Sequence, residues 1–262
     1  MSTTIGMTAS PAWSPARAYA LEAKYELLKL IRMPGYALPS IAFPAMFYLL
    51  FGVLFGRGIV GGVTMSTYLI ATYGAFGVIG ASLFGFGVGV AVERGQGWML
   101  LKRASPMPPM AFFVAKLTLC VIFACAVVGV LSILGVTLGH VQLPAATWIR
   151  LAATLVLGAV PFCALGLALG YNVGPNSAPP IVNLIYLPMS FLSGLALPFE
   201  ILPPPVKAIA PFLPAYHLGQ LALGAIGAGA GESAWTHIAA LAGFTILGLA
   251  LAVLGFRRDQ EG

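Results

Sequence analysis

The sequence predicts an all-α integral membrane protein with six transmembrane helices, and three observations lead to that fold class. Of the 262 residues, 60% are hydrophobic and only 8% are charged, and the mean hydropathy is +0.97. A soluble domain carries roughly 25% charged residues, so this chain has too few polar side chains to cover a water-facing surface. A span needs about 20 apolar residues, so the length accommodates about six spans in a single transmembrane domain, residues 1–262.

An amphipathic surface helix is expected over residues 14–33, ahead of the first span. Ser14 and Pro15 suit an N-cap and a first helical position. The residues that follow mix apolar and charged side chains at helical spacing, and Pro34 and Gly35 end the pattern. The segment before this helix lacks the apolar core of a cleaved signal peptide, so the first span is expected to stay in place as an anchor.

The first three spans are expected at about residues 37–55, 68–92 and 110–138. The second is rich in glycine, and Gly85 and Gly89 form a small-xxx-small pattern that lets neighbouring backbones approach closely. Lys116 lies about two turns into the third span. Its long side chain is expected to reach back to the lipid headgroups.

The remaining spans are expected at about residues 148–171, 178–195 and 235–256. Residues 197–231, between the last two, form a segment that is too long and too apolar for a simple loop. Prolines divide it into apolar runs that are too short to cross a bilayer. We therefore expect short re-entrant helices there, dipping partway into the outer leaflet before the sixth span.

The distribution of Lys and Arg predicts the orientation. With the N-terminus inside, the inner segments hold ten of these residues and the outer segments hold three, which are Arg57, Arg150 and Lys207. The positive-inside rule then places both termini in the cytosol. The net charge of +6 reflects this topology, and we expect no nucleic-acid binding. A multi-pass protein of the bacterial plasma (inner) membrane is predicted.

Known catalytic and metal-binding patterns are missing from the sequence, which has no G-x-x-x-x-G-K-[ST] phosphate loop and no G-x-S-x-G elbow. His140, His217 and His237 are expected to lie scattered near the outer surface, and the three cysteines to be small buried hydrophobes. The spans are expected to lack the buried Asp or Glu that ion-driven transporters generally need. We therefore expect no enzyme, no metal and no cofactor on this chain, and an external energy source for any uphill transport.

Residues 93–109 form the densest charged cluster between spans and are expected to lie in the cytosol. Four charged side chains gathered there, in a nearly uncharged chain, favour contact with a soluble partner through charge-assisted hydrogen bonds and apolar side chains. The alternative is an ordinary positive-inside anchor. The residues expected to make the contacts are Glu93, Arg94, Trp98, Met99, Leu101, Lys102 and Arg103.

Two blocks of sequence resemble the ABC-2 type permeases, the membrane subunits of drug, antibiotic and polysaccharide exporters. One is Glu93-Arg94-Gly95 followed by LLKRASP at residues 100–106, and the other is LPMSFLSG at residues 187–194 followed by Leu-Pro pairs. The resemblance covers essentially the whole chain. It implies a six-helix half with a cytosolic connecting helix at residues 14–33 and a coupling helix between the second and third spans.

The resemblance also implies partners. Two permease halves, a homodimer or a pair with a paralogue, would combine with ATP-binding cassette subunits that bind ATP and Mg. The chain is then predicted to be the permease subunit of an exporter that moves an amphipathic, drug-like or lipid-linked solute out of the cytosol among membrane lipids. The stretch Gly95-Gln96-Gly97-Trp98 departs from the Glu- or Thr-rich segment expected in the family.

The candidate solute path consists mainly of aromatic residues in the spans, although such residues often only pack. Phe47 and Phe51 are four apart and share a helix face. Asn183 is the strongly polar side chain that lies well inside a span. The candidates are Phe47, Phe51, Phe84, Phe86, Asn183 and Phe191. Two other functions stay open: an ATP-independent secondary transporter or channel, and an intramembrane enzyme that would use Ser193 or His217.

Overall fold

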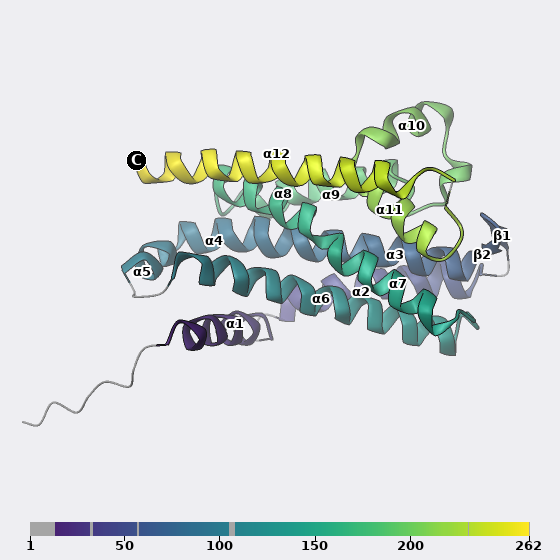
Figure 1. Cartoon of the computed structure of the whole chain (residues 1–262), viewed down its shortest axis with the longest axis horizontal. Coiled ribbons are helices and arrows are strands. Elements are labelled where there is room, and N and C mark those ends of the chain that lie inside the picture. The colour runs from purple at the N-terminus through teal and green to yellow at the C-terminus, as the bar shows by residue number, and fades with distance from the viewer. Residues whose placement is uncertain (1–13, 32–33, 57, 105–107, 230, 262) are drawn as a thin grey trace, which may run out of the picture.

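The computed structural model describes residues 14–31, 34–56, 58–104, 108–229 and 231–261, most of them helical. The helices form an elongated bundle (Figure 1). One end carries the N-terminal helix α1 (Pro15–Ile31), the short helix α5 (Trp98–Ala104) and the C-terminal end of α12 (Ala234–Glu261). We call this the inner end and the opposite one the outer end, after the predicted orientation.

Four helical stretches among the described residues are long and apolar enough to cross a membrane: Met65–Gly95, Met110–Thr137, Ala145–Asn172 and Ala234–Arg258. They match the predicted second, third, fourth and sixth spans. Two shorter apolar helices, Ile41–Val53 and Ala178–Leu192, occupy the positions of the predicted first and fifth spans. The all-α membrane class is thereby confirmed, whereas six full crossings stay a prediction.

The central element is the continuous stretch of α3 (Met65–Ser82), the π-helical η2 (Leu83–Val88) and α4 (Gly89–Gly95). All α3 residues from Ser66 to Ser82 are buried. Thr64 caps the N-terminus of α3, because its hydroxyl accepts a hydrogen bond from the Thr67 amide at 3.3 Å. The helices around α3 therefore share it as a common core.

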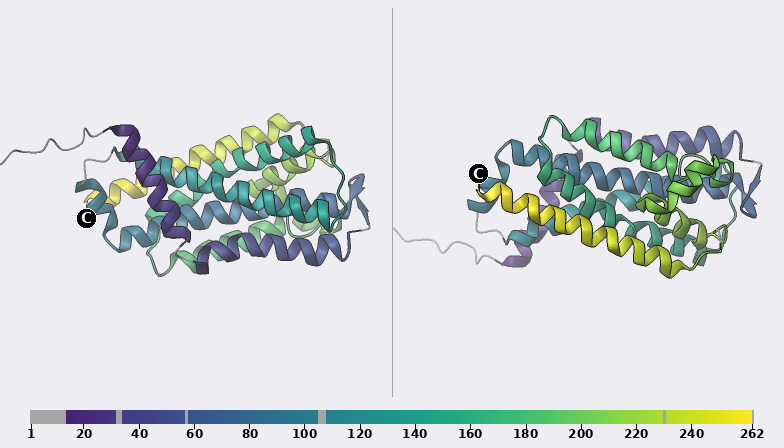
Figure 2. Two further views of the ribbon diagram at one scale, coloured as in Figure 1. Left: turned by 90° about the horizontal axis from the view of Figure 1, so that it is seen from below. Right: turned by 90° about the horizontal axis from the view of Figure 1, so that it is seen from above.

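The N-terminal part of the chain crosses one side of this core. α1 lies across the inner end at a steep angle to the other helices (Figure 2) and packs on α6 (Pro109–Thr137), which suits the predicted surface helix; residues 32–33 of that prediction lie outside the described ones. α2 (Pro34–Phe47) continues into the π-helical η1 (Tyr48–Val53). A hairpin of β1 (Ile59–Val60) and β2 (Val63–Thr64) follows. Its turn residues Gly61 and Gly62 both have positive φ, as a type I′ turn requires.

The predicted fourth span is divided into α7 (Ala145–Leu157) and α8 (Ala159–Asn172). α8 packs closely on η2 through glycines. A Cβ on Gly170 would lie 2.9 Å from the Phe86 carbonyl oxygen, and one on Gly87 would lie 3.4 Å from that of Gly166. The close approach thus involves Gly87, whereas Gly89 of the predicted pair lies beside Lys116.

The outer segment consists of short helices that follow α9 (Ala178–Leu192), in agreement with the prediction; its Ala230 lies outside the described residues. They are η3 (Phe199–Ile201), α10 (Pro204–Ile209), η4 (Ala210–Phe212) and α11 (Pro214–Ala225). Two α3 tyrosines hold this segment: the Tyr73 hydroxyl donates to the Ala196 carbonyl at 3.1 Å, and the Tyr68 hydroxyl accepts from the Phe199 amide at 3.3 Å. How deeply these helices enter a membrane stays a prediction.

The last helix, α12, runs along α8 (Figure 2). Gly248 and Gly255 face α8, where a Cβ on Gly248 would lie 2.8 Å from the backbone of Ala164. The opposite face of α12 carries exposed apolar side chains such as Ile246, as expected for contact with lipid. Among the cysteines, Cys120 and Cys163 are buried as predicted, but Cys125 is exposed on the outside of α6.

Candidate functional site

The most unusual feature of the inner end is a buried carboxylate. Glu93 lies in the last turn of α4, and its side chain has 0% exposure. Lys29 of α1 and Lys116 of α6 both form ion pairs with its Oε1 atom, the latter at 2.6 Å. A carboxylate in such surroundings is stable only with close cationic partners. Glu93 therefore joins three elements that are distant in sequence.

Lys116 extends this arrangement to a second carboxylate. Its ammonium group is buried and donates to Glu26 of α1 at 2.8 Å as well as to Glu93. Gly89 lies beside it, and a Cβ there would lie 3.6 Å from Nζ, an ordinary contact distance. We call Glu26, Lys116, Glu93 and Lys29 the inner charge chain, because positive and negative groups alternate along it.

The inner charge chain corrects two expectations. Lys116 does not reach back to the headgroups, because two carboxylates within hydrogen-bonding distance hold its ammonium inside the protein. The second helical stretch also contains a buried acid, Glu93, which the sequence analysis did not expect. Removing one member of such a buried pair costs about 3–5 kcal/mol, because it leaves an uncompensated charge.

Arg94 connects α4 to the turn between α8 and α9. Its guanidinium donates to the carbonyl oxygens of Tyr171 and, at 3.0 Å, of Val173. These carbonyls lie at the C-terminal end of α8, where the last backbone acceptors of a helix lack intrahelical partners and a cation is favourable. The planar guanidinium can reach both oxygens at once.

Two glycines shape the turn from α4 into α5. A Cβ on Gly95 would lie 2.5 Å from Cγ of Pro175, so the absence of a side chain permits contact with the α8–α9 turn. Gly97 has a φ of +74°, which other residues adopt only with strain. The Gly95-Gln96-Gly97 departure from the family pattern therefore has a structural reason. Gly95 permits the close contact with Pro175, and Gly97 permits the positive φ of the turn.

Beyond this turn, α5 presents apolar side chains. Trp98 is exposed, with the Lys29 ammonium 5.0 Å from its ring centroid, and Leu101 is 71% exposed. Met99 instead packs on the core. Lys102 and Arg103 belong to α5, but their side chains lie outside the described part of the chain. The predicted contact residues thus separate into an inward group (Glu93, Arg94, Met99) and an outward group (Trp98, Leu101).

Three of the candidate path residues lie in one aromatic cluster. Phe47 and Phe51 stack with centroids 6.3 Å apart, and Phe47 also meets the edge of Phe76 at 6.1 Å. Tyr186 of α9 lies between Phe76, at 4.8 Å, and Phe84, at 6.1 Å. The cluster therefore connects α2, α3, η2 and α9.

The other three candidates lie apart from this cluster. Phe86 lines an apolar groove of about 520 Å³ with residues of α6, α8 and α12. Asn183 and Phe191 are exposed on α9. A single continuous path through all six residues is therefore not evident within one copy of the chain.

At the outer end, two histidines pair, contrary to the expectation that they lie scattered. Nδ1 of His217 (α11) lies 3.0 Å from Nδ1 of His237 (α12), Nε2 of His217 lies 2.9 Å from the Pro211 carbonyl oxygen, and Nε2 of His237 lies 3.4 Å from Glu232. We call these groups the outer histidine chain. Because 20 residues separate the two histidines, no local pattern predicts their meeting.

The proton positions in the outer histidine chain follow from these distances. A carbonyl only accepts, so Nε2 of His217 carries a proton and its Nδ1 accepts one from Nδ1 of His237. Nε2 of His237 faces the Glu232 carboxylate at 3.4 Å, which can accept an N–H from this nitrogen. A second proton, on His217, would place two N–H groups face to face.

Within the part of the chain that the structure describes, no three His, Cys, Asp or Glu side chains are grouped to hold a metal ion. The hydroxyl of Ser193 is buried without a hydrogen-bond partner, and His217 is engaged with Pro211 and His237. These two candidates for an intramembrane enzyme therefore form no hydrogen bond with each other.

Comparison with known proteins identifies the family. A protein of Bacillus subtilis (strain 168) named "Putative transport permease YvfS" is 25% identical to this chain over 236 residues, which is 90% of this chain and 95% of that protein. The family model described as ABC-2 type transporter matches residues 18–226, from α1 through the inner charge chain to α11. The chain therefore belongs to the ABC-2 type transporter family of membrane permeases.

Proposed function

We propose that this chain is the permease subunit of an ATP-driven exporter, which moves an amphipathic, drug-like or lipid-linked solute out of the cytosol. A separate ATP-binding cassette subunit would bind ATP and Mg and hydrolyse the nucleotide. Membership in the ABC-2 family supports such a partner. The outward direction, the solute class and the coupling are the proposed parts.

The observation that carries this proposal is the joint between α4 and α5. Buried ion pairs connect it to α1 and α6, and Arg94 and Gly95 connect it to the α8–α9 turn. A displacement of α5 would therefore also move α1, α6 and the α8–α9 turn, because close packing and ion pairs transmit the movement directly. This is the mechanical requirement for a membrane subunit driven from the cytosol.

In this proposal the predicted contact residues have two different roles. Trp98 and Leu101, with the basic Lys102 and Arg103 beside them, would meet the ATPase. Exposed large apolar side chains such as Trp98 and Leu101 are typical of protein contacts. Glu93 and Arg94 would not touch the partner, but would hold the segment that does.

A second copy of the chain is the proposed neighbour of α9. The Asn183 amide is exposed on that helix, between exposed apolar side chains such as Leu184 and Leu187. In lipid an amide without partners is costly, and an amide from a neighbouring helix can satisfy it. This favours a homodimer whose two copies of α9 face each other, with the aromatic cluster behind them as a wall of the solute path.

The test is transport in proteoliposomes that contain the chain and a phosphate-loop ATPase that co-purifies with it. Leu101→Asp should abolish co-purification and ATP-dependent export, because it places a charge in the proposed interface. Ile59→Asp, an equally exposed position at the outer end, is the matched control and should leave both intact. Full export by Leu101→Asp would contradict the proposed docking of the ATPase on α5.

The alternative is an ATP-independent transporter, and the buried carboxylates Glu26 and Glu93 favour it over a simple channel. Ionisable groups inside a membrane protein are typical of proton pathways. Here each carboxylate already forms an ion pair with a lysine. Solute uptake driven by a proton gradient, with the purified chain alone, would establish the alternative and refute the ATP-driven proposal.

A further inference from the structure

The apolar groove of about 520 Å³ between α6, α8 and α12 lies in the inner half of the bundle. η2 and α8 form its floor, where Phe86 and Leu167 are buried. α6 and α12 form its walls, where Met110 and Leu249 are exposed. Its size is usual for a small-molecule site, about 300–1,000 Å³. The groove therefore opens from the side of the bundle, where a membrane protein meets lipid.

The lining of the groove offers few hydrogen-bonding groups. The Thr245 hydroxyl donates to the Leu241 carbonyl at 2.8 Å, so its hydrogen bond stays within α12. The Tyr171 ring meets the edge of the Phe256 ring, with centroids 5.5 Å apart. A polar occupant would lose hydrogen bonds in such surroundings, whereas a hydrocarbon chain has none to lose. The lining therefore favours a hydrocarbon chain.

The length of the groove matches the depth of one leaflet. On α12 its lining extends from Thr245 to Phe256, and on α8 from Val160 to Tyr171. Each interval rises about 16 Å along its helix. The hydrocarbon core of a bilayer is about 30 Å thick, so the chains of one leaflet extend about 15 Å. A single acyl chain therefore fits the groove lengthwise, parallel to the helices.

Positive charge lies at the inner mouth of the groove. Arg257 is exposed and follows the groove residue Val253 by four positions in α12, so their Cβ atoms lie about 5–6 Å apart. On the facing wall, Met110 lies in the first turn of α6, where the helix dipole is positive. Asp259 and Glu261 follow further along α12, with side chains outside the described part of the chain. The described groups at the mouth therefore favour a negatively charged headgroup.

We propose that this groove binds an anionic phospholipid of the inner leaflet, with one acyl chain in the groove and the phosphate beside Arg257. The second acyl chain would stay in the bilayer. Arginine suits phosphate oxygens, because its planar guanidinium donates charge-assisted hydrogen bonds. A basic residue at the membrane surface also attracts anionic lipids. The site depends neither on ATP coupling nor on the proposed solute path.

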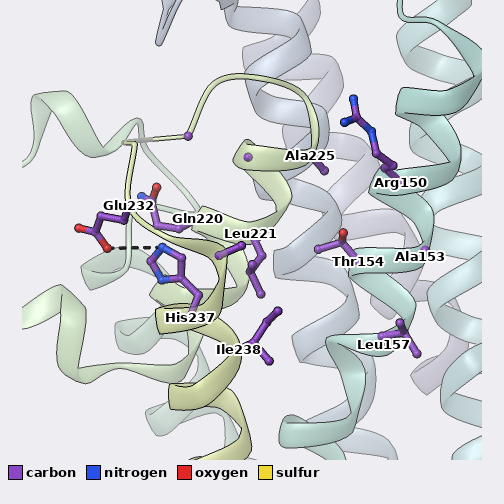
Figure 3. Close-up of a pocket in the computed structure, with 13 residues that line it drawn as sticks. Arg150, Ala153, Thr154, Leu157, Gln220, Leu221, Ala225, Glu232, His237 and Ile238 are labelled. Atoms are coloured by element: carbon purple, nitrogen blue, oxygen red, sulfur yellow. Dashed lines mark ion pairs between the residues drawn. The ribbon is translucent and has the colours of Figure 1, made fainter.

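The pocket at the outer end has a different character. It has a volume of about 590 Å³ and lies between α7, α11 and the start of α12 (Figure 3). Arg150 and Glu232 both line it, but the Glu232 carboxylate lies beside His237 and points away from Arg150 (Figure 3). Thr154 and Gln220 add further polar groups. A hydrocarbon chain would leave such groups without partners, so this pocket serves as the reference region below.

The experiment is native mass spectrometry of the full-length chain in detergent, titrated with phosphatidylglycerol and with phosphatidylethanolamine of the same acyl chains. Both lipids offer the chain and the phosphate, but only phosphatidylglycerol carries a net negative charge. It should bind about fivefold more tightly, which is the contribution of one basic residue near an anionic headgroup. Equal affinity for the two lipids would overturn the proposal.

Two matched pairs of variants in α12 locate the site. Val253 and Leu254 are 49% and 52% exposed, but only Val253 lines the groove. Val253→Trp should fill the groove and abolish saturable binding of both lipids, whereas Leu254→Trp should not. Arg257→Gln should remove the preference for phosphatidylglycerol, whereas Arg258→Gln, which follows Leu254 by four positions, should keep it. Equal effects within either pair would refute the assignment.

Cross-linking tests the proposal on the unmodified chain. Phosphatidylglycerol with a diazirine in one acyl chain should label peptides that cover residues 110–117 and 245–256. Labelling only around the outer pocket, at residues 150–157 and 232–238, would refute the proposal. A cross-link between two copies of the chain through residues 110–117 or 245–256 would refute it as well, because a second copy would then cover the groove.

Discussion

Both ends of the bundle are held by a row of ionisable side chains, but the groups differ in kind. The inner charge chain alternates lysine and glutamate side chains, which form ion pairs with one another. The outer histidine chain is built on His217 and His237, and imidazole titrates near neutral pH. The inner end is therefore held together by ion pairs, whereas the outer end contains imidazoles whose charge depends on the pH of the medium.

The two rows also differ in what they connect. The inner charge chain fastens a surface helix and a short loop helix to the long spans, which are parts that would otherwise separate easily. The outer histidine chain fastens the short helix α11 to α12. If this comparison holds, loss of the buried cation Lys116 from the inner charge chain should have a large effect, and loss of the outer histidine chain a smaller one that depends on pH.

The largest effect is expected for Lys116→Met. It leaves Glu26 and Glu93 buried without their shared cation, and we expect a loss of about 3–5 kcal/mol in the free energy of unfolding. Unfolding of the detergent-solubilised chain measures it. The Glu93→Met, Lys116→Met double variant should recover part of the loss, since one buried charge of each sign is removed. A loss below about 1 kcal/mol in the single variant would show that the inner charge chain is not a stabilising element.

Gly95→Ala tests the inner joint through packing rather than charge. The added Cβ would lie 2.5 Å from Pro175, so the α4–α8 contact must open, at a cost of about 1–3 kcal/mol, with loss of ATP-dependent export. Gly174→Ala is the control in the same turn, because a Cβ there meets nothing within 4 Å. Similar losses in the two variants would argue against close contact at Gly95.

Lowering the pH tests the outer histidine chain. Burial lowers the pKa of the His217 imidazole below its ordinary value, so the folded chain favours its neutral form. The stability that this gives is present above the ordinary pKa of about 6.5 and is lost as the pH falls below it. We expect the free energy of unfolding to fall by on the order of 1 kcal/mol between pH 8 and pH 5. Thermal unfolding over that pH range measures this change. His217→Gln should reduce this pH dependence. An unchanged profile would show that the pH dependence does not arise from the outer histidine chain.

The smallest effect is expected for Lys29→Met. Lys29 pairs with the same carboxylate as Lys116, but its side chain is 29% exposed, and Glu93 keeps its other partner. Water therefore screens the pair, and the loss should stay under about 1 kcal/mol. The same unfolding measurement applies. A loss equal to that of Lys116→Met would mean that solvent exposure does not decide how much each member of the inner charge chain contributes to stability.

Much of the architecture could be predicted without coordinates. The second and third spans were expected at residues 68–92 and 110–138, and the helices extend over Met65–Gly95 and Pro109–Thr137. The N-terminal helix and the short outer helices were likewise expected. These features depend on composition, length and proline positions within a few turns of chain, which one sequence contains in full.

The candidate site was predictable only in outline. The sequence indicated residues 93–109 as a special loop, but expected Glu93 to face a partner and Lys116 to face lipid. Sequence distance explains the difference, since Lys116 meets Glu93 across 23 residues and Glu26 across 90. A local pattern shows that a charge exists and does not show which opposite charge folding brings to it.

The amino-acid sequence by itself therefore determined the membrane class, the positions of the spans and the family resemblance. Only the tertiary structure decided that Glu93 and Lys116 face each other, that Gly95 meets Pro175 and that His217 pairs with His237. The physical reason is that the entry of a segment into the membrane depends on its hydrophobicity, which is averaged over many side chains. An ion pair or a close contact is a property of two atoms, and packing alone sets the distance between them.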